Sequence, residues 1–348
     1  MEHPDEELFE RAGRIIRDGG LVAFPTETVY GLGGDALNPE AAGKIYAAKG
    51  RPSDNPLIVH IAEPGQLAEI AAEIPESARK LTDAFWPGPL TLILPKKSIV
   101  PDATSGGLST VAVRMPADPA ALRLIHASGR FIAAPSANAS GRPSPTTAAH
   151  VMEDLGGRIE MILDGGQTSI GLESTIVDLT GEVPCILRPG FINREMLEAV
   201  LPEVQLDPGL LQGDEKDAPP PKAPGMRYRH YAPKAPLFVV EGPEEAVTAK
   251  ILEMAFACVR EGKRTGIIAS DAAAHVYASS LPEEKTLICP VGAREEDSTI
   301  ARMLFRTLRE MDEGDVDVIY SEAFNTPQLG LAIMNRLLKA AGHQVIHA

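Results

Sequence analysis

Cysteine and aromatic residues are scarce in this 348-residue sequence. The three cysteines, Cys185, Cys258 and Cys289, are far apart and odd in number. They form no CxxC pair, so they are a poor basis for a disulfide framework. We expect them to be reduced core thiols, as in a cytoplasmic protein. Aromatic residues make up 5% of the chain, with a single tryptophan, which argues against an extensive stacking platform for single-stranded nucleic acid.

Long apolar runs are also missing. No segment approaches the ~18 consecutive apolar residues that a membrane-spanning helix requires. Residues 1–18 are acidic and amphipathic and lack the basic, apolar and cleavage regions of a secretory signal. We therefore predict a soluble, cytoplasmic protein without a membrane partner.

Basic residues are outnumbered, 33 to 48, which gives a formal net charge of -15. Broad binding to phosphate backbones needs a basic surface, so we expect no extensive direct nucleic-acid binding. This net charge is compatible with a small basic pocket for one anionic ligand, because local charge can oppose net charge.

The commonest catalytic signatures are absent as well. The sequence has no P-loop GxxxxGK[ST], and the glycines of 31–34 do not form a GxGxxG fingerprint. HExxH, a cysteine–histidine zinc cluster and a GxSxG elbow are missing too. Any nucleotide would need a different cradle.

The first 200 residues alternate irregularly between short strands and helices. Strands are predicted at 21–24, 57–61, 91–94, 110–114, 131–134, 161–163, 174–179 and 185–187. Helices are predicted over the opening segment before Gly19-Gly20, from Asn38-Pro39 to about Ala48, at 64–72, 76–85 and 118–128, and from Asn193. Strands follow one another too closely for regular βαβ winding. The fold class is therefore α/β with a large, mixed, twisted sheet.

Composition changes near residue 205, and the length of the chain favours two domains. Residues 205–236 are rich in Pro, Gly and Asp, which predicts an extended connector without regular structure. Beyond them, strands at 237–240, 265–269, 286–289 and 316–320 alternate with helices at 244–261, 296–312 and 328–341, as in a small Rossmann-like domain. The predicted organisation is a domain over 1–204, a connector over 205–236 and a domain over 237–348.

Polar clusters recur where predicted strands end, which is where α/β proteins place their chemistry. Thr28 lies in the Gly-rich run 25–33 after the first strand, which on its own also fits a tight surface turn. Lys49 and Arg51 precede a strand in a Gly/Pro-rich loop, as a polyphosphate would need, although cations also complement the end of a helix. His60 within an apolar strand is more often a core residue than a ligand. Arg114, at a strand end, needs an anionic partner if it is buried.

Three further clusters repeat the pattern: 135–141 with Ser136 and Asn138, 171–178 with Ser174, and 187–190 with Arg188. Their hydroxyl and amide groups could bind a ligand or cap their own turns. No single cluster decides between these interpretations. Five clusters in one domain favour a ligand pocket, and the residues alone support an anionic-ligand site.

These segments together resemble the YrdC-type threonylcarbamoyl-AMP synthase family. The resemblance rests on runs that occur in the family's order: 24–35, 49–60, 86–94, 109–116, 134–143, 172–178 and 187–192. Residues 229–233, Arg-His-Tyr-Ala-Pro, match the connector of the family's longer form. The resemblance implies a YrdC-like twisted sheet around a concave cavity, plus a smaller Rossmann-like C-terminal domain.

The resemblance also implies a reaction. L-Threonine is carboxylated by bicarbonate, and the carbamate attacks the α-phosphorus of ATP to give threonylcarbamoyl-adenylate and pyrophosphate. Other proteins then transfer the threonylcarbamoyl group to tRNA. Phosphoryl transfer of this kind needs positioning and charge neutralisation more than a covalent nucleophile. Mg²⁺ would be held by the ATP phosphates, because no carboxylate stands out as a metal ligand.

Carried over position by position, the resemblance assigns three sets of residues. The catalytic cations are Lys49 and Arg51, and the ATP-binding set is Lys49, Arg51, Asn55, Thr110, Ser136, Asn138, Thr146 and Arg188. The L-threonine-binding set is Thr28, His60, Arg114 and Ser174. Tyr231 is implied to reach back over the pocket from the connector, which we predict to act as a lid.

Several alternatives stand beside this assignment. Ser136 could be a nucleophile, but no His–Asp partner is evident in the sequence. Glu27 could be a general base or could organise its loop, and it is not included in the predicted site. Two other functions are an accessory that binds double-stranded RNA, which the net charge opposes, and a carbamoyl-phosphate-dependent maturation enzyme, whose zinc-finger and acylphosphatase-like regions are missing.

Overall fold

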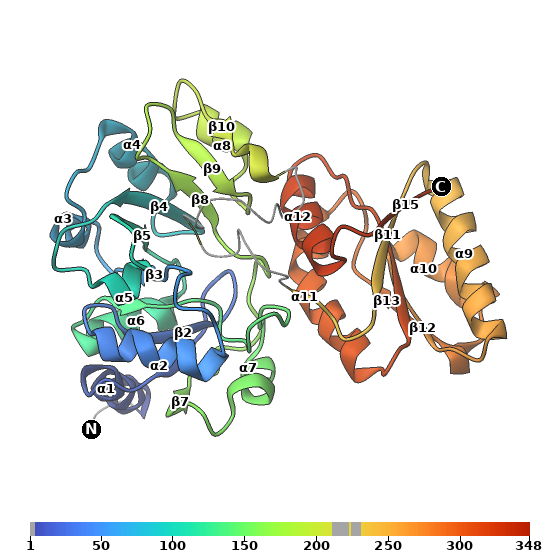
Figure 1. The fold of residues 1–348 in the computed structure, drawn as a ribbon, viewed down its shortest axis with the longest axis horizontal. Helices are drawn as coiled ribbons and strands as arrows, with labels where there is room; N and C mark the ends of the chain where they lie inside the picture. The colour runs from blue at the N-terminus through green and yellow to red at the C-terminus, as the bar shows by residue number, and fades with distance from the viewer. Residues whose placement is uncertain (1–3, 211–222, 224–230) are drawn as a thin grey trace. The chain divides into compact units, whose positions relative to one another are not determined.

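A computed structural model describes residues 4–210, 223 and 231–348 of the chain (Figure 1). Backbone contacts divide the chain into two compact units. The first unit comprises residues 1–140 and 144–228, and the second comprises residues 141–143 and 229–348. The three-residue segment 141–143 therefore belongs with the second unit, although its sequence neighbours on both sides belong to the first.

The first unit is built on one large mixed sheet. Its strands are β1 (Val22–Phe24), β2 (Gly31–Asp35), β3 (Ile58–His60), β4 (Leu90–Pro95), β5 (Thr110–Arg114), β6 (Ile132–Ala133), β7 (Met161–Ile162), β8 (Thr175–Asp178), β9 (Cys185–Arg188) and β10 (Gln205–Leu206). They form a ten-stranded sheet in the order β10-β9-β8-β4-β5-β3-β6-β2-β1-β7. Its α-helices are α1 (Pro4–Arg17), α2 (Pro39–Lys49), α3 (Leu67–Ile70), α4 (Glu76–Phe85), α5 (Asp102–Ser105), α6 (Pro119–Ser128), α7 (Ala148–Leu155) and α8 (Arg194–Glu198). The sheet contains both parallel and antiparallel pairs, as the mixed-sheet prediction requires.

The ends of helix α2 are set by local sequence, and its last residue is Lys49, directly before the loop that contains Arg51. The Asn38 side chain accepts a hydrogen bond from the Glu40 amide at 2.9 Å, and Pro39 occupies the first helical position. Gly50 ends the helix in the left-handed conformation, with φ 62°. Lys49 is thereby the last helical residue, and the chain turns directly after it.

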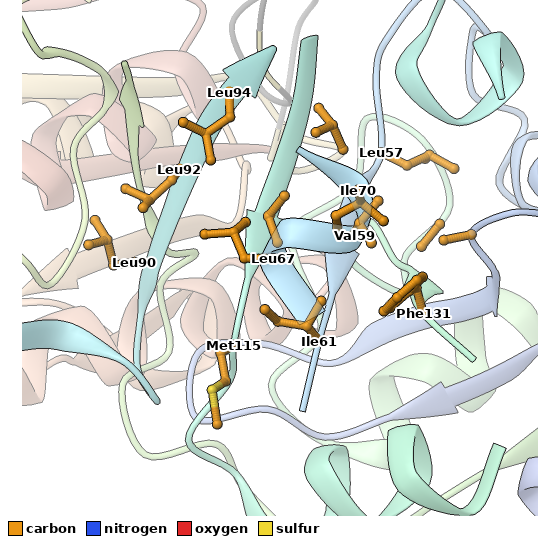
Figure 2. Close-up of a cluster of buried hydrophobic side chains, with 14 of the residues drawn as sticks. Leu57, Val59, Ile61, Leu67, Ile70, Leu90, Leu92, Leu94, Met115 and Phe131 are labelled. Atoms are coloured by element: carbon orange, nitrogen blue, oxygen red, sulfur yellow. The ribbon is translucent and has the colours of Figure 1, made fainter. Parts of the chain in front are cut away.

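One face of the sheet carries the main apolar core of the first unit. Figure 2 shows Leu90, Leu92 and Leu94 aligned along β4, with Leu57 and Val59 from the β3 segment in the same cluster. These side chains are all almost completely buried. Since alternate residues of a strand point to opposite faces, the intervening residues of the same strands lie on the other face.

That other face carries buried polar residues in register. Thr91 of β4 pairs with Arg114 of β5, and Arg114 pairs with His60 of β3. Residues that pair directly across strands project from the same face, so these three polar side chains form a row there. All three are buried. The face also carries a small apolar cluster that contains Ala223, the one described residue between positions 211 and 230 of the connector.

The second unit has a simpler, fully parallel sheet. Its strands are β11 (Leu237–Glu241), β12 (Thr265–Ala269), β13 (Thr286–Pro290), β14 (Val318–Glu322) and β15 (Val345–His347), in the order β13-β12-β14-β11-β15. The strands alternate with α9 (Glu244–Arg260), α10 (Asp271–Ser280), α11 (Asp297–Glu313) and α12 (Gly330–Ala340). Figure 1 shows α9 and α10 on one face of this sheet and α11 and α12 on the other. The winding is Rossmann-like, as predicted.

Several sequence predictions need correction. The Gly-rich segment after β1 is partly strand, because Gly31–Asp35 forms β2. The helix predicted over 64–72 is a 3-10 turn (Pro64–Gln66) followed by the short α3. The connector is not wholly irregular, since β10 and a 3-10 turn (Pro208–Leu210) lie at its start. Residues 211–222 and 224–230 of the connector lie outside the described residues.

The cysteines and the membrane prediction can also be compared with the structure. All three cysteines are free, but only Cys289 is buried, whereas Cys185 and Cys258 are partly exposed. The prediction of core thiols was therefore wrong for two of the three. Among the described residues, no helix combines the length and apolar character that crossing a membrane needs.

Candidate active site

A buried arginine marks the first part of the site. Arg114 ends β5 and is 4% exposed. Its guanidinium donates to Thr28 Oγ1 at 2.9 Å and to the Gly88 carbonyl at 3.3 Å, and its Nη2 is 2.7 Å from Oε1 of Glu27. Glu27 is thus the anionic partner that the burial of Arg114 requires. Both carboxylate oxygens of Glu27 and Nη2 of Arg114 nevertheless lack a hydrogen bond of good geometry among the described residues.

A second arginine lies against a buried serine at the edge of the same region. Arg188 of β9 donates from Nε to the Ser174 carbonyl at 3.0 Å and from Nη2 to Ser174 Oγ at 3.1 Å. Ser174 Oγ is also 2.7 Å from Thr91 Oγ1. Gly190 allows this packing, because a Cβ there would lie 2.5 Å from the Thr175 amide nitrogen. Ser174 is thereby fixed between Thr91 and Arg188.

His60 is electrically neutral at physiological pH. Burial, followed by the positive charge of Arg114, lowers the pKa of its imidazole to about 3. Nδ1 lies 3.1 Å from the Ile58 carbonyl, and the ring packs edge-on against Phe24. These contacts are those of a core histidine. The register of β3 and β5 nevertheless places His60 directly beside Arg114. His60 can therefore contribute a neutral polar surface but not a charge.

A lysine defines the second part of the site. Lys49 is 5% exposed, and its Nζ donates to the backbone carbonyls of Ser136 and Asn138, the latter at 2.6 Å. Ser136 Oγ donates to Asn138 Oδ1 at 2.6 Å. The three residues come from α2 and from the loop after β6, and the structure brings them into direct contact. Ser136 bonds to an amide rather than to a histidine, so nothing here activates it as a nucleophile.

Backbone hydrogen bonds join the loops that carry these two clusters. The Ala137 amide donates to the Tyr30 carbonyl at 2.8 Å, and the Leu32 amide donates to the Pro135 carbonyl at 2.9 Å. The Gly171 amide donates to the Thr28 carbonyl at 3.1 Å. The loops after β1 and β6 and the loop before β8 are therefore tied together. Thr28 and Lys49 are linked through them.

The remaining predicted nucleotide residues are Arg51, Thr110, Asn55 and Thr146. Arg51 donates to the Pro56 carbonyl at 3.1 Å, and its guanidinium lies 5.9 Å from the centre of the Tyr46 ring. Thr110 begins β5, about 13 Å along the strand from Arg114. Asn55 and Thr146 are 1% and 0% exposed, and Asn55 Oδ1 and Thr146 Oγ1 have no hydrogen-bond partner among the described residues. Such buried, unsatisfied atoms are rare and call for a partner.

Tyr231, the predicted lid residue, belongs to the second unit. It is 5% exposed, adopts φ 63°, and its ring centre lies 4.9 Å from that of Phe305. The following amide, of Ala232, donates to the Gly141 carbonyl at 2.9 Å, within the same unit. The role of Tyr231 as a lid stays a prediction.

Sequence reasoning missed two residues of the site. Glu27 was considered only as a base or a loop organiser, whereas it is the charge partner of Arg114. Thr91 was treated as an ordinary strand residue, although it holds Ser174. A single threonine inside the apolar run Leu-Thr-Leu-Ile-Leu was the available signal for Thr91.

The composition of the site opposes that of the whole chain. In a chain of net charge -15, Arg114, Arg188 and Lys49 are buried among hydroxyl, amide and carbonyl groups. The cations and the hydroxyl and amide donors among these groups can bind and orient carboxylates and phosphates without a covalent step. The fold and the site thus define an α/β protein with buried cations beside strand ends and loops on one face of a mixed sheet, an arrangement suited to anionic ligands.

Comparisons with known proteins specify the family. The model of the family described as "Telomere recombination" matches residues 14–190, and that of the "Threonylcarbamoyl-AMP synthase, C-terminal domain" matches residues 192–342. The threonylcarbamoyl-AMP synthase of Pyrococcus abyssi is 51% identical over 99% of this chain and 97% of its own length. That of Bacillus subtilis is 49% identical over 97% of this chain and 93% of its own length. The chain belongs to the threonylcarbamoyl-AMP synthase family.

A solved structure agrees with the fold over both units. The crystal structure of P. abyssi Sua5 complexed with L-threonine matches with a TM-score of 0.91 and 50% sequence identity. The match covers 100% of this chain and 98% of that one. The α/β fold with a second, parallel-sheet domain is thereby confirmed, as is the family to which the sequence was compared.

Proposed function

We propose that this chain forms L-threonylcarbamoyladenylate from L-threonine, bicarbonate and ATP, with release of pyrophosphate. The observation that carries the proposal is the buried Arg114 with Thr28 beside it and His60 and Thr91 in its row. An amino acid needs a guanidinium for its carboxylate and hydroxyl groups for its side chain, and this face of the sheet supplies both. The full-length similarity to threonylcarbamoyl-AMP synthases supports the same reaction.

At the threonine end, Arg114 binds the substrate carboxylate. Its Nη2 keeps hydrogen-bonding capacity next to the Glu27 carboxylate, so a substrate carboxylate can take a hydrogen bond there while Glu27 balances the charge. Thr28 and Ser174 offer hydroxyl groups for the side chain of threonine. His60, being neutral, adds no repulsion toward the substrate ammonium group. These groups orient threonine so that its amine is carboxylated and its carbamate faces the phosphate end.

At the phosphate end, Lys49 and Arg51 neutralise the charge that develops on the ATP phosphates as pyrophosphate leaves. Ser136 and Asn138 position the phosphates, because they already share hydrogen bonds with Lys49. Asn55 and Thr146 have unsatisfied buried oxygens that suit a polar ligand, and with Thr110 and Arg188 they complete the nucleotide-binding set. Arg188 also bonds Ser174, so it can couple the two ends.

Mg²⁺ accompanies ATP in this proposal and neutralises its phosphates. The described residues contain no group of three His, Cys, Asp or Glu side chains that could hold a metal ion. The oxygen ligands available near Lys49 belong to serine, asparagine and the backbone. They can contact a hydrated Mg²⁺ without forming a dedicated metal site. The protein's part is then to hold the phosphates to which the ion is bound.

The product is an activated carbamate, so the proposal requires a partner. Downstream threonylcarbamoyl-transfer proteins would place the group on an adenosine of tRNA. With a net charge of -15, this chain is poorly suited to bind the tRNA extensively by itself.

The connector forms a lid over the threonine end in this proposal. Ala223 is fully buried and packs with Ile58, Ala112 and Ile176, on the face that carries His60 and Arg114. A connector residue on that face is what a lid requires. Cleavage of the chain near Asp214 should therefore lower activity and ATP affinity, and unchanged values would contradict the lid.

Pyrophosphate release tests the reaction. The purified chain with MgATP should release pyrophosphate only when L-threonine and bicarbonate are both present. Omitting each reactant in turn provides the controls, with L-serine in place of L-threonine to test the side-chain contact. Release that is independent of threonine and bicarbonate would rule out the proposed reaction.

A further inference from the structure

The second unit contains a cavity of its own. Its volume is about 420 Å³, and it lies at the carboxyl ends of the parallel strands. Glu244 follows β11, Ser270 follows β12, Arg294 follows β13 and Glu322 ends β14, and all four line the cavity. In open parallel α/β sheets, ligands bind outside this end of the strands. The position is that of a ligand site, and no residue of the proposed reaction lies there.

One corner of the cavity offers unpaired hydrogen-bond donors. Ser270 is the N-cap of the ten-residue helix α10, but its side chain makes no capping hydrogen bond. Ser270 is 96% buried, its exposed fraction being 4%, and it lines the cavity. The first-turn amides of Ala272 and Ala273, which also line the cavity, have no acceptor among the described residues. A helix start with free amides attracts an anionic group, and a buried hydroxyl without a partner needs one.

The floor of the cavity is a rigid, charge-balanced network. Glu322 is 1% exposed and accepts from Arg294 Nη2 at 2.6 Å, from the Ser270 amide at 3.3 Å and from Tyr277 Oη at 3.4 Å. Arg294 Nη1 also donates to the Ala323 carbonyl at 2.9 Å. The network fixes Ser270 at the start of α10. Glu322 and Arg294 neutralise each other, and Arg294 Nε also lies 3.4 Å from Oε1 of Glu244 at the rim of the cavity.

The opposite side of the cavity is acidic and partly apolar. Glu244 and Glu245 occupy the first turn of α9, and the Glu244 side chain is 75% exposed. Leu252 of α9 and Val276 of α10 add apolar side chains to the lining. Among the described residues, the lining beyond Glu322 and Arg294 carries two carboxylates and no further cation. Repulsion from them disfavours a nucleotide or another polyanion.

We propose that this cavity binds a free amino acid as a zwitterion. Its carboxylate would lie at the start of α10, on the Ser270 hydroxyl and the amides of Ala272 and Ala273. Its ammonium group would face Glu244 and Glu245. A ligand of this class satisfies the unpaired donors at the start of α10 and also faces the excess of carboxylates at the start of α9, which a simple anion or a simple cation would not.

Isothermal titration of the full-length protein tests the proposal. Each of the standard amino acids is titrated into the wild type, Val276→Trp, Ser270→Ala and Ser279→Ala. Val276 is 44% exposed, so a tryptophan there fills the cavity without entering the core. Ser279 is the matched control, on the same helix but at its other end, where its hydroxyl bonds the Val276 carbonyl at 3.0 Å. Thermal unfolding of each variant confirms that it is folded.

At least one amino acid should bind the wild type and lose that binding in Val276→Trp. Ser270→Ala should weaken it about tenfold, as expected for a hydrogen bond to a charged group, and Ser279→Ala should leave it unchanged. If the ligand is L-threonine, the wild type should bind two equivalents and Val276→Trp one. Binding of every amino acid that is equal in the wild type and Val276→Trp would overturn the proposal. So would a site that takes inorganic phosphate or a dicarboxylate in preference to amino acids.

Discussion

The two sheets of this molecule place their polar groups in different ways. In the mixed sheet of the first unit, Thr91, Arg114 and His60 lie in a row across one face, near one end of three adjacent central strands. In the parallel sheet of the second unit, Ser270 and Glu322 lie at the strand ends. Helices cover both faces of the parallel sheet, so only its ends are open to a ligand. Part of one face of the mixed sheet carries these buried polar and charged groups, whereas residues of α1 and α6 pack with Ile132 on another part of it. The buried charged groups need partners.

Breaking the charge pair on the face of the mixed sheet should have the largest effect. Arg114→Gln leaves Glu27 buried without a cation, and we expect a loss of about 3–5 kcal/mol in unfolding free energy. The only tryptophan, Trp86, is buried in the first unit, so its fluorescence during urea unfolding reports on that unit. The double variant Glu27→Gln/Arg114→Gln should recover most of the loss. An unchanged stability in the single variant would mean that the pair is not buried in solution.

Arg51, one of the two cations proposed at the phosphate end, should affect turnover rather than folding. Arg51→Ala should cost about 2–4 kcal/mol in transition-state stabilisation, measured as kcat/KM for pyrophosphate release. Arg260→Ala, an exposed arginine at the end of α9 in the second unit, is the matched control and should retain full activity. Wild-type turnover in Arg51→Ala would remove Arg51 from the phosphate site.

The neutral histidine should make the first unit sensitive to acid. The pKa of His60 falls from 6.5 to about 3 in the folded chain, so below pH 6.5 the unfolded chain binds a proton that the folded chain does not. The stability from this group is therefore present above pH 6.5 and is lost as the pH falls toward 3. At pH 4 we expect a loss on the order of 3 kcal/mol.

The loss is measured by urea unfolding, followed by Trp86 fluorescence, at a series of pH values. His60→Gln should flatten the profile between pH 6.5 and 4, while His126→Gln, at an exposed position in the last turn of α6, should not. Parallel profiles for the wild type and His60→Gln would show that His60 titrates normally.

The smallest effect is expected at a hydroxyl that supports the site indirectly. Thr91→Val removes the hydrogen bond to Ser174 Oγ, which should cost about 1 kcal/mol of stability and raise KM for threonine several-fold. kcat should change little, because Thr91 acts by positioning Ser174. Thr82→Val, whose hydroxyl bonds only to the Arg79 carbonyl of its own helix α4, should leave KM unaltered. A fall in kcat at constant KM would instead place Thr91 in the chemical step.

In the second unit, the sequence predicted strands with a clear apolar run, such as β12, but missed helix α10 and strand β15. Strand β12 has the predicted bounds, because its apolar run is bounded by charged residues and Ser270. Helix α10 and strand β15 were not predicted, since the Ala-rich α10 shows little amphipathic periodicity and β15 has only three residues. Both depend on tertiary packing rather than on local pattern.

In the first unit, strand β2 and the contacts of the site also depend on tertiary packing, which local sequence patterns do not reveal. Strand β2, Gly-Leu-Gly-Gly-Asp, has a low strand propensity, and it forms because close packing favours glycine. A Cβ on Gly33 would lie 2.7 Å from the Ile132 side chain. Polar clusters at strand ends could be found from sequence, but the pairs Arg114–Glu27 and Thr91–Ser174 depend on sheet register and loop packing, which residue patterns do not specify.

The central claim is that the first unit joins three reactants into one adenylate. The most direct measurement incubates the chain with MgATP, L-threonine and ¹³C-bicarbonate and follows the product by ¹³C and ³¹P NMR. The account predicts a ¹³C-labelled carbonyl coupled to the adenylate phosphorus, formed together with pyrophosphate. A product without the ¹³C label, or labelled carbon with no coupling to phosphorus, would contradict it.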